Sequence, residues 1–572
     1  MKVRFKRTIT LSLAIVAAIT FNALASHSPA SQQQAEPVQE SWRQPAMGNH
    51  GAVTAGHPLA AQAGLEVLQD GGNAIDAVVA MAGVLAVVRP HMNGIGGDTF
   101  MLIYDAADGQ VHGLNGSGRA GSLADADDLR NRGLSQMPGR GLDAVTVPGT
   151  VSAWAAAASR FGSRRLSALM RPAILTAFGG FPVTPKLAAD LQASSSVISE
   201  SSELSRIFKP NGTLLEVGDL LIQENLGNSL RMIAESNGTS FYQGELAGTL
   251  ADYFATNGGL ITRDDLANHT ADWVTPLVTS YRGLDVHVLP PNTQGIALLM
   301  GLNLLEQFDM DRFSATSPEY LHLLIEAKKL AFADRDEHVA DPAGYEAPID
   351  SLISKLYAGE QAGRIDPQRA AVEVGTGQAR RFDDDTVVCT ATDIQGNVVV
   401  LIQSLFNAFG SGEMAGSTGI ILQNRGALFS LEPGHPNELQ AGRRSYHTLC
   451  PTLIMRDGTP VLGLATPGGD GQVQTLMQVI NNWHIFDMNI QQAIEAPRFR
   501  SYDGLDVSLE DSVGLDTISA LESRGHRLRL FWTGQSAAFG GAQGIVILQS
   551  GAAGVLYMAG ADPRREAIAL AW

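Results

Sequence analysis

The stretch DDDTVVCTAT (residues 383–392) decides the fold, because a polar segment meets a strand within it. Residues 366–385 are polar and charged without an apolar period, which predicts an exposed, mobile linker. The β-branched run 386–392 predicts a short strand. Residues 393–397 then predict a turn, and residues 398–403 predict the return strand. A mobile linker that ends at a rigid hairpin is a chain suited to cleavage at the junction.

The bond between Asp385 and Thr386 has the chemistry that an N-terminal nucleophile requires. The hydroxyl of Thr386 can attack the preceding carbonyl and form an ester, which water then cleaves. The new N-terminal threonine would carry both the nucleophile and a free α-amine that acts as its base. A threonine that merely packs on a sheet is far commoner, so this junction alone does not establish the function.

The flanking sequence alternates helices and strands. Residues 58–70 predict a helix that two glycines stop, and residues 74–88 predict a buried apolar helix. Residues 94–98 form a glycine-rich turn before a predicted strand at residues 99–104. Because these glycines follow a helix and precede a strand, they are not a dinucleotide fingerprint.

Three further helical features are predicted. Residues 148–204 are largely helical in pattern, and Thr262 is a plausible helix cap. Another helix is predicted from Pro318 to about Ala333, with Ser317 as its cap.

The composition limits the classes of partner. A chain of 572 residues is too long for one ordinary core, so we expect a large domain or two closely packed halves. Its 58 acidic and 40 basic residues give a net charge of −18, which disfavours nucleic acid and anionic membranes. A small-molecule amide substrate is compatible, since one local arginine can hold a carboxylate. The sequence has no zinc-spaced His/Cys cluster, P-loop or nucleotide fingerprint, so no metal or organic cofactor is predicted.

The N-terminus has the pattern of an export signal. A basic start precedes an apolar run at about residues 9–24, and Ala23 and Ala25 supply the small residues of a cleavage site. We predict a signal peptide at residues 1–25, a flexible linker at 26–45 and a secreted or periplasmic location. The alternative is a membrane anchor, but the apolar run is short for a spanning helix. The two cysteines, Cys389 and Cys450, are predicted to be free and mostly buried.

Beyond these patterns, the chain resembles the γ-glutamyltranspeptidase family over nearly all of the mature sequence. The motifs occur in the family's order, at residues 72–77, 94–97, 147–151, 259–262, 265–266, 281–283, 331–335, 385–386, 409–412, 467–469, 496–499 and 562–565. The resemblance implies an α/β fold, the four-layer αββα sandwich of N-terminal-nucleophile hydrolases. It also implies a large subunit of residues 46–385 and a small subunit of residues 386–572, each the other's partner.

The same resemblance implies the catalytic residues. Thr386 matches the nucleophile, and Gly468 and Gly469 match the oxyanion-hole glycines, where a missing Cβ lets backbone N–H groups approach a developing oxyanion. Ser404 matches a hydroxyl that hydrogen-bonds the nucleophile and helps processing. The alternatives are a plain turn for the two glycines and a satisfied strand serine for Ser404.

The substrate-holding positions depart from the family. By position, Ser117 replaces an arginine that grips the substrate carboxylate, although Arg119 lies two residues on. Leu428 replaces the acid that binds the substrate amino group. Phe406 replaces an asparagine, with Asn407 next to it, and a serine pair becomes His447-Thr448. The loss of two charged contacts, worth about 1.5–3 kcal/mol each, predicts a rebuilt specificity.

Two functions within one class follow from this pattern. The chain is predicted to be a self-processing amidohydrolase acting on γ-glutamyl amides such as glutathione, or on an oxamate-like or other acyl amide. Residues 423–426 and 447–449 resemble a divergent branch that includes oxamate amidohydrolases. Arg119 or Arg425 could hold a small carboxylate without an amino group, while the alternative for Arg425 is a structural ion pair. The rival from another class is a secreted binding protein without turnover, against which the retained Thr386 and Ser404 argue.

Overall fold

The computed structural model describes residues 41–374, 384–550 and 554–572. The predicted signal peptide and residues 26–40 of the predicted linker lie outside these ranges. At the described end of that linker, the backbone N–H groups of Trp42 and Arg43 donate hydrogen bonds to the carboxylate of Glu495. Within the described ranges, every helix is too short or too polar to cross a membrane.

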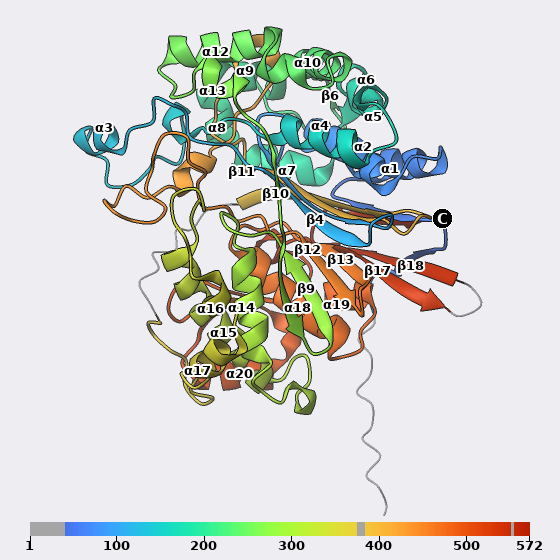
Figure 1. Ribbon diagram of the computed structural model, residues 1–572, viewed down its shortest axis with the longest axis vertical. Helices are drawn as coiled ribbons and strands as arrows, with labels where there is room; N and C mark the ends of the chain where they lie inside the picture. Colours follow the sequence, from blue (N-terminus) through green and yellow to red (C-terminus); the bar gives the residue numbers. More distant parts are fainter. Residues whose placement is uncertain (1–40, 375–383, 551–553) are drawn as a thin grey trace, which may run out of the picture. The chain divides into compact units, whose positions relative to one another are not determined.

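Two seven-stranded antiparallel sheets lie at the centre of the described chain (Figure 1). The first sheet has the order β1 (Ala46–Gly48), β18 (Gly554–Ala561), β17 (Gln543–Ser550), β13 (Thr459–Ala465), β12 (Thr452–Arg456), β9 (Leu284–Val288) and β8 (Leu277–Tyr281). The second has the order β19 (Ile568–Ala571), β2 (Ala52–Ala55), β10 (Asp384–Thr392), β11 (Val398–Asn407), β3 (Asp98–Asp105), β4 (Gln110–Gly116) and β7 (Asp272–Val274).

The alternation of side chains along the strands separates two cores. Phe100 and Leu102 of β3 pack in one cluster with Leu453 and Ile545 of the other sheet. Met101, the residue between them, belongs instead to the cluster beneath the helices. Because successive strand residues point to opposite faces, an apolar strand can serve a sheet–sheet core and a helix–sheet core together.

Helices cover the outer face of each sheet (Figure 1). Over the second sheet lie α1 (Pro58–Gln69), α2 (Ala74–Val88), α4 (Thr150–Phe161), α5 (Leu166–Leu169), α6 (Arg171–Gly179) and α10 (Glu224–Glu235). Over the first sheet lie α14 (Gly295–Leu305), α15 (Pro318–His338), α18 (Gly471–His484), α19 (Ile490–Glu495) and α20 (Leu515–Ser523). The layers therefore run helix, sheet, sheet, helix, and the predicted αββα sandwich is confirmed.

The described chain has further α-helices and strands besides those of these layers. They are α3 (Ala126–Asn131), β5 (Phe181–Pro182), α7 (Pro185–Ala193), α8 (Ser195–Glu200), α9 (Ser202–Phe208), β6 (Leu220–Leu221), α11 (Thr239–Tyr242), α12 (Glu245–Asn257), α13 (Arg263–Ala267), α16 (Ile349–Leu352), α17 (Lys355–Ala362), β14 (Phe499–Ser501), β15 (Asp506–Glu510) and β16 (Arg527–Phe531).

Most predicted elements are confirmed, including both N-terminal helices, the strand after the glycine-rich turn and the Thr262 cap. Ser317 is the N-cap residue of α15, as predicted, but its side chain makes no capping hydrogen bond. Its hydroxyl donates instead to the carbonyl oxygen of Ser314, and helix α15 continues past Ala333 to His338. Both cysteines are free and buried, as predicted.

The predicted linker at residues 366–385 is exposed at residues 366–369, 372 and 373, as predicted, but the backbone at Ala370 and Ala371 is hydrogen-bonded to the rest of the protein. The backbone N–H of Ala370 donates to the carbonyl oxygen of Arg524 at 2.8 Å. Ala371 accepts from Lys329 Nζ at 2.8 Å and donates to Glu326 Oε2 at 3.1 Å, so buried polar groups of α15 hold this segment. Residues 375–383 lie outside the described chain. Strand β10 begins at Asp384, so the predicted cleavage junction lies inside a strand.

Candidate active site

Thr386 lies at an irregularity in the central hairpin. Strand β10 pairs with β11 through Asp385 opposite Phe406 and through Val387 opposite Gln403, with a register shift between these pairs. Thr386 alone therefore stands opposite Ser404 and Leu405, so the extra residue of this bulge is in β11, and the Thr386 side chain is buried. A bulge releases backbone groups from regular pairing, so the peptide bond between Asp385 and Thr386 can take other hydrogen-bond partners.

A chain of hydroxyl contacts surrounds the bond between Asp385 and Thr386. Thr386 Oγ1 donates to Ser404 Oγ at 3.1 Å, and Ser404 Oγ donates to the carbonyl oxygen of Asp385 at 2.7 Å. The backbone N–H of Phe406 donates to the same Ser404 oxygen at 2.7 Å. Ser404 thus contacts both the predicted nucleophile and the carbonyl that this nucleophile would attack.

The backbone after Ser404 is unusually shaped. Phe406 has a φ of +79°, a left-handed conformation that a non-glycine residue seldom adopts, and Phe409 has a φ of +60°. On the other side of Ser404, an added Cβ at Gly97 would lie 2.4 Å from the Ser404 carbonyl oxygen. The glycine-rich turn before β3 therefore has to be small, because it packs directly against the residue that contacts Thr386.

Gly468 and Gly469 form the turn between β13 and α18. Their φ values are +122° and +50°, so glycine is required at Gly468 by conformation rather than by crowding. Gln294 Nε2 donates to the Gly469 carbonyl oxygen at 2.9 Å. Among the described residues, neither glycine N–H donates to a protein acceptor. Both N–H groups lie just before a helix N-terminus, where donors and the helix dipole favour an anion.

Asp470 follows the two glycines and is held by buried polar groups. Arg335 Nη1 lies 2.8 Å from Asp470 Oδ1, and the Tyr446 hydroxyl donates to the same oxygen at 3.1 Å. Burial alone would raise the pKa of the Asp470 carboxyl, but the charges of Arg335, Arg500 and Lys328 and the Tyr446 hydrogen bond together outweigh it, and the pKa is lowered. These contacts fix the start of α18 and with it the glycine turn.

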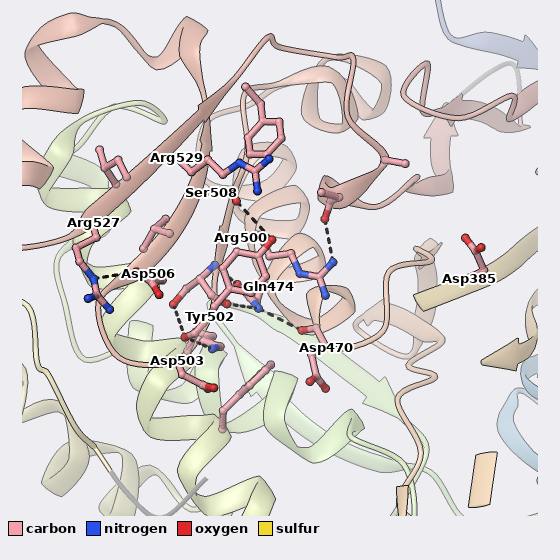
Figure 2. Close-up of a pocket in the computed structure, with 18 of the residues that line it drawn as sticks. Asp385, Asp470, Gln474, Arg500, Tyr502, Asp503, Asp506, Ser508, Arg527 and Arg529 are labelled. Carbon is pink, nitrogen blue, oxygen red and sulfur yellow. Dashed lines mark hydrogen bonds and ion pairs between the residues drawn. The ribbon is translucent and has the colours of Figure 1, made fainter. Parts of the chain in front are cut away.

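One cavity lies between Asp385, at the cleavage junction, and Asp470, which follows the glycine pair. It has a volume of about 660 Å³, and Asp385 and Asp470 both line it. In Figure 2, Asp385 stands on one side and Asp470, Arg500 and Tyr502 stand on the other. The structure therefore brings the residue before the predicted nucleophile and the residue after the predicted oxyanion glycines to one cavity.

A buried arginine, Arg425, contacts Phe406 of the hairpin. Arg425 stacks over the ring of Phe406, with its guanidinium carbon 4.3 Å from the ring centroid, and its Nη1 donates to Thr448 Oγ1 at 3.1 Å. Ala144, Ala427 and Leu428 complete an apolar cluster around Phe406. Since Phe406 pairs with Asp385, this cation and its apolar surroundings adjoin the cleavage junction.

Asn407, another predicted substrate contact, lies opposite Asp384 in the hairpin. Its backbone N–H donates to Asn424 Oδ1 at 3.1 Å. Its own side-chain oxygen is buried and has no hydrogen-bond partner among the described residues. Since an unsatisfied buried acceptor is costly, this oxygen is available to a donor on a bound molecule.

His447 faces an acid that the sequence did not reveal. Its Nε2 lies 3.2 Å from Asp98 Oδ2, and both side chains are completely buried. The backbone N–H of Leu449 donates to Nδ1 at 3.3 Å, so the imidazole proton belongs on Nε2 and points at Asp98. Burial lowers the pKa of His447 well below its usual value, with a further effect from Arg425, and burial raises the pKa of Asp98 to about 7.

Arg119 is engaged elsewhere. Its Nη2 lies 2.9 Å from Asp272 Oδ2, and Arg444 Nη1 pairs with the same carboxylate oxygen. Arg119 remains one-third exposed. This ion-paired arrangement gives the arginine a structural partner, whereas Arg425 adjoins the hairpin directly.

Comparison with known proteins fits this geometry. The sequence profile of the family described as gamma-glutamyltranspeptidase matches residues 60–572. The chain belongs to this family. The glutathione hydrolase-like YwrD proenzyme of Bacillus subtilis is 37% identical, with 92% of this chain and 99% of that protein aligned. The glutathione hydrolase proenzyme of Escherichia coli is 33% identical, with 98% of each chain aligned.

A solved structure agrees in fold. The crystal structure of a cephalosporin acylase from Bacillus halodurans matches with a TM-score of 0.87 and 38% identity, over 94% of this chain and 98% of that one. This γ-glutamyltranspeptidase-family chain is therefore an amidohydrolase of the N-terminal-nucleophile fold. Its similarity to proenzymes agrees with a chain that processes itself into two subunits.

Sequence reasoning missed three residues of this γ-glutamyltranspeptidase-family site. They are Asp98, Arg335 and Asp470, and each lies in or next to a motif that the sequence displays. Asp98 ends the glycine-rich turn at residues 94–98, Arg335 ends the motif at residues 331–335, and Asp470 follows the glycine pair. Adjacency to a motif was the available signal, but a pairing across more than a hundred residues is visible only in the folded chain.

Two groups of side chains in the described residues have the composition of metal ligands. One is His322, Glu326 and His526, and the other is Asp105, Asp108 and His112. Neither group includes a residue of the site around Thr386. In the first group, Lys329 Nζ already binds Glu326 Oε1 at 2.8 Å, and its charge opposes a cation there.

Proposed function

We propose that this enzyme uses Thr386 to cleave amides whose acyl group carries a carboxylate but no α-amino group. The observation that carries the proposal is the buried guanidinium of Arg425, stacked on Phe406 beside the cleavage junction. A guanidinium in a site of low dielectric suits a carboxylate. Leu428 packs in the apolar cluster around Phe406, at the position where the family has the acid that binds an ammonium group.

The proposed maturation step uses the contacts around Ser404. The Thr386 hydroxyl attacks the Asp385 carbonyl carbon, the C–N bond breaks, and the hydroxyl proton passes to the departing nitrogen. Ser404 donates to the carbonyl oxygen on which negative charge develops. Water then hydrolyses the resulting ester, releasing the Asp385 carboxylate and a free N-terminal Thr386.

The proposed turnover repeats this chemistry on a substrate. The α-amine of Thr386 accepts the hydroxyl proton and delivers it to the leaving amine, while the acyl group forms an ester with Thr386. The N–H groups of Gly468 and Gly469, which have no protein acceptor among the described residues, are the proposed oxyanion donors. Water resolves the acyl-enzyme.

The second candidate substrate is a γ-glutamyl amide such as glutathione. It is favoured by the similarity to the glutathione hydrolase proenzyme of Escherichia coli and to the glutathione hydrolase-like proenzyme of Bacillus subtilis. A γ-glutamyl group adds an ammonium to the carboxylate, and Leu428 cannot pair with that charge. The cephalosporin acylase similarity supports a site for acyl groups of another kind.

A set of three anilides separates these candidates. Glutaryl-4-nitroanilide and γ-glutamyl-4-nitroanilide have the same carbon chain and carboxylate and differ only in the α-amino group, while butanoyl-4-nitroanilide lacks both charged groups. We expect kcat/KM to be highest for the glutaryl compound. Hydrolysis of oxamate is measured in the same series. Preference for the γ-glutamyl compound would favour the second candidate, and equal rates for the glutaryl and butanoyl compounds would refute recognition of a carboxylate.

A further inference from the structure

We infer that Arg565 is a positioning residue for self-cleavage, which holds the Asp385 side chain so that the scissile carbonyl stays on Ser404. This inference rests on the proposed cleavage between Asp385 and Thr386. Arg565 Nη1 lies 3.4 Å from Asp385 Oδ1, and both residues line the 660 Å³ cavity. Arg565 belongs to the motif at residues 562–565, for which the proposed chemistry has no other use.

The position of Arg565 is fixed by its surroundings. Its Nη2 donates to the Ala537 carbonyl oxygen at 3.3 Å, and its side chain is nine-tenths buried. An added Cβ at Gly541 would lie 2.7 Å from Arg565 Cδ, so the side chain passes over a glycine. A guanidinium held in this way is a rigid anchor rather than a mobile surface charge.

The neighbouring charges are committed to other partners. Arg564 pairs with Glu510 and Asp562 in a completely buried network. Glu566 pairs with Arg89. Among the described residues, Asp385 is therefore the carboxylate that Arg565 binds. Three consecutive charged residues, 564 to 566, each have a different partner.

The strand irregularity explains why an anchor is needed. The register between β10 and β11 shifts between Asp385 and Val387, so regular pairing does not continue across the bond between Asp385 and Thr386. Ser404 holds the Asp385 carbonyl oxygen at 2.7 Å, and Arg565 holds the same residue through its carboxylate. Two fixed points on one residue restrict rotation of the scissile carbonyl, and small misplacements of reacting groups slow a reaction strongly.

A double-mutant cycle on the maturation rate tests the inference. The full chain is made by cell-free synthesis, and conversion to two fragments is followed by denaturing gel and intact mass. Arg565→Ala and the nearly isosteric Asp385→Asn are each expected to slow conversion by about 100-fold. The double variant is expected to be no slower than the slower single variant, because both changes remove one contact. Arg565→Lys, which keeps the charge, is expected to recover part of the rate.

Arg529→Ala is the matched control, since Arg529 lines the same cavity and makes a cation–π contact with Phe531 instead of binding Asp385. Single variants within twofold of the parent rate, additive effects in the double variant, or equal slowing by Arg529→Ala would each overturn the inference. The mass of the small fragment distinguishes a failure of the Arg565 inference from a failure of the proposed cleavage site. A fragment that does not begin at Thr386 refutes the cleavage site, whereas correct cleavage at an unchanged rate refutes only the role of Arg565.

Discussion

The side-chain oxygen of Ser404 donates a hydrogen bond to the carbonyl oxygen of Asp385 at 2.7 Å. The same oxygen accepts a hydrogen bond from the hydroxyl of Thr386 at 3.1 Å. One serine therefore holds the attacking group and polarises the attacked group before any bond changes. This arrangement is preorganised, so little of the activation free energy is spent on reorienting groups during the reaction.

Replacement of Thr386 by alanine removes the proposed nucleophile. We expect Thr386→Ala to remain a single chain and to have no amidase activity, as judged by intact mass and anilide hydrolysis. Thr392→Ala is the matched control. Thr392 lies in the same strand, and its buried hydroxyl has no partner among the described residues. Cleavage of the Thr386→Ala chain at the same bond would refute the mechanism.

Replacement of Ser404 by alanine removes a donor to the developing oxyanion. Loss of one such donor typically costs about 10²- to 10³-fold in rate, and we expect maturation of Ser404→Ala to slow by that factor. A time course on denaturing gels measures it. Ser411→Ala serves as control, because its buried hydroxyl bonds the Leu422 carbonyl oxygen instead. Maturation of Ser404→Ala at the parent rate would contradict the role of Ser404.

Replacement of Arg425 by glutamine removes the proposed carboxylate contact. A charge-assisted hydrogen bond is worth about 1.5–3 kcal/mol, so kcat/KM for the glutaryl anilide should fall about 10- to 100-fold. The butanoyl anilide should change far less, because it has no carboxylate. Equal losses on both substrates would indicate that Arg425 supports the fold rather than specificity. Leu428→Asp should improve the γ-glutamyl anilide relative to the glutaryl one.

The Asp98–His447 pair predicts a pH dependence of stability. Burial raises the pKa of Asp98 from 3.8 to about 7, so the folded state binds a proton that the unfolded state has lost between these values. This contribution to stability is fully present below about pH 4 and is lost as pH rises through about 7. The free energy of unfolding, measured with urea from pH 4 to 8, should therefore fall more steeply with pH in the parent than in Asp98→Asn. Parallel curves would show that Asp98 does not titrate in this range.

The fold could be predicted largely from local sequence patterns. Residues 74–88 are almost entirely apolar, and a helix without a polar face is expected to be buried. The structure buries every residue of this helix. The hairpin at Thr386 followed from its β-branched run and turn. The start of β10 at Asp384 did not, because acidic residues have low strand propensity and the pairing with Phe406 and Asn407 is imposed by the neighbouring strand.

The candidate site was predictable where chemistry and motif coincide. Thr386, Ser404 and the glycine pair were predicted as site residues, and the structure brings Thr386 and Ser404 into contact. Partners distant in sequence were not predictable. Arg119 was as plausible a carboxylate ligand as Arg425, and only the folded chain shows that Asp272 engages Arg119. Likewise, His447 could not be matched to Asp98, from which 349 residues separate it.

The strand order shows that the proposed cut would break the chain but leave both sheets intact. Strand β2 lies between β19 and β10, so a strand from before the bond is sandwiched between two from after it. In the other sheet, β1 and β9 flank a block of four later strands. Each sheet contains strands from both products, so neither product has a complete sheet alone. The mature enzyme should thus behave as an obligate heterodimer that dilution does not dissociate, and its halves should melt together in one cooperative transition.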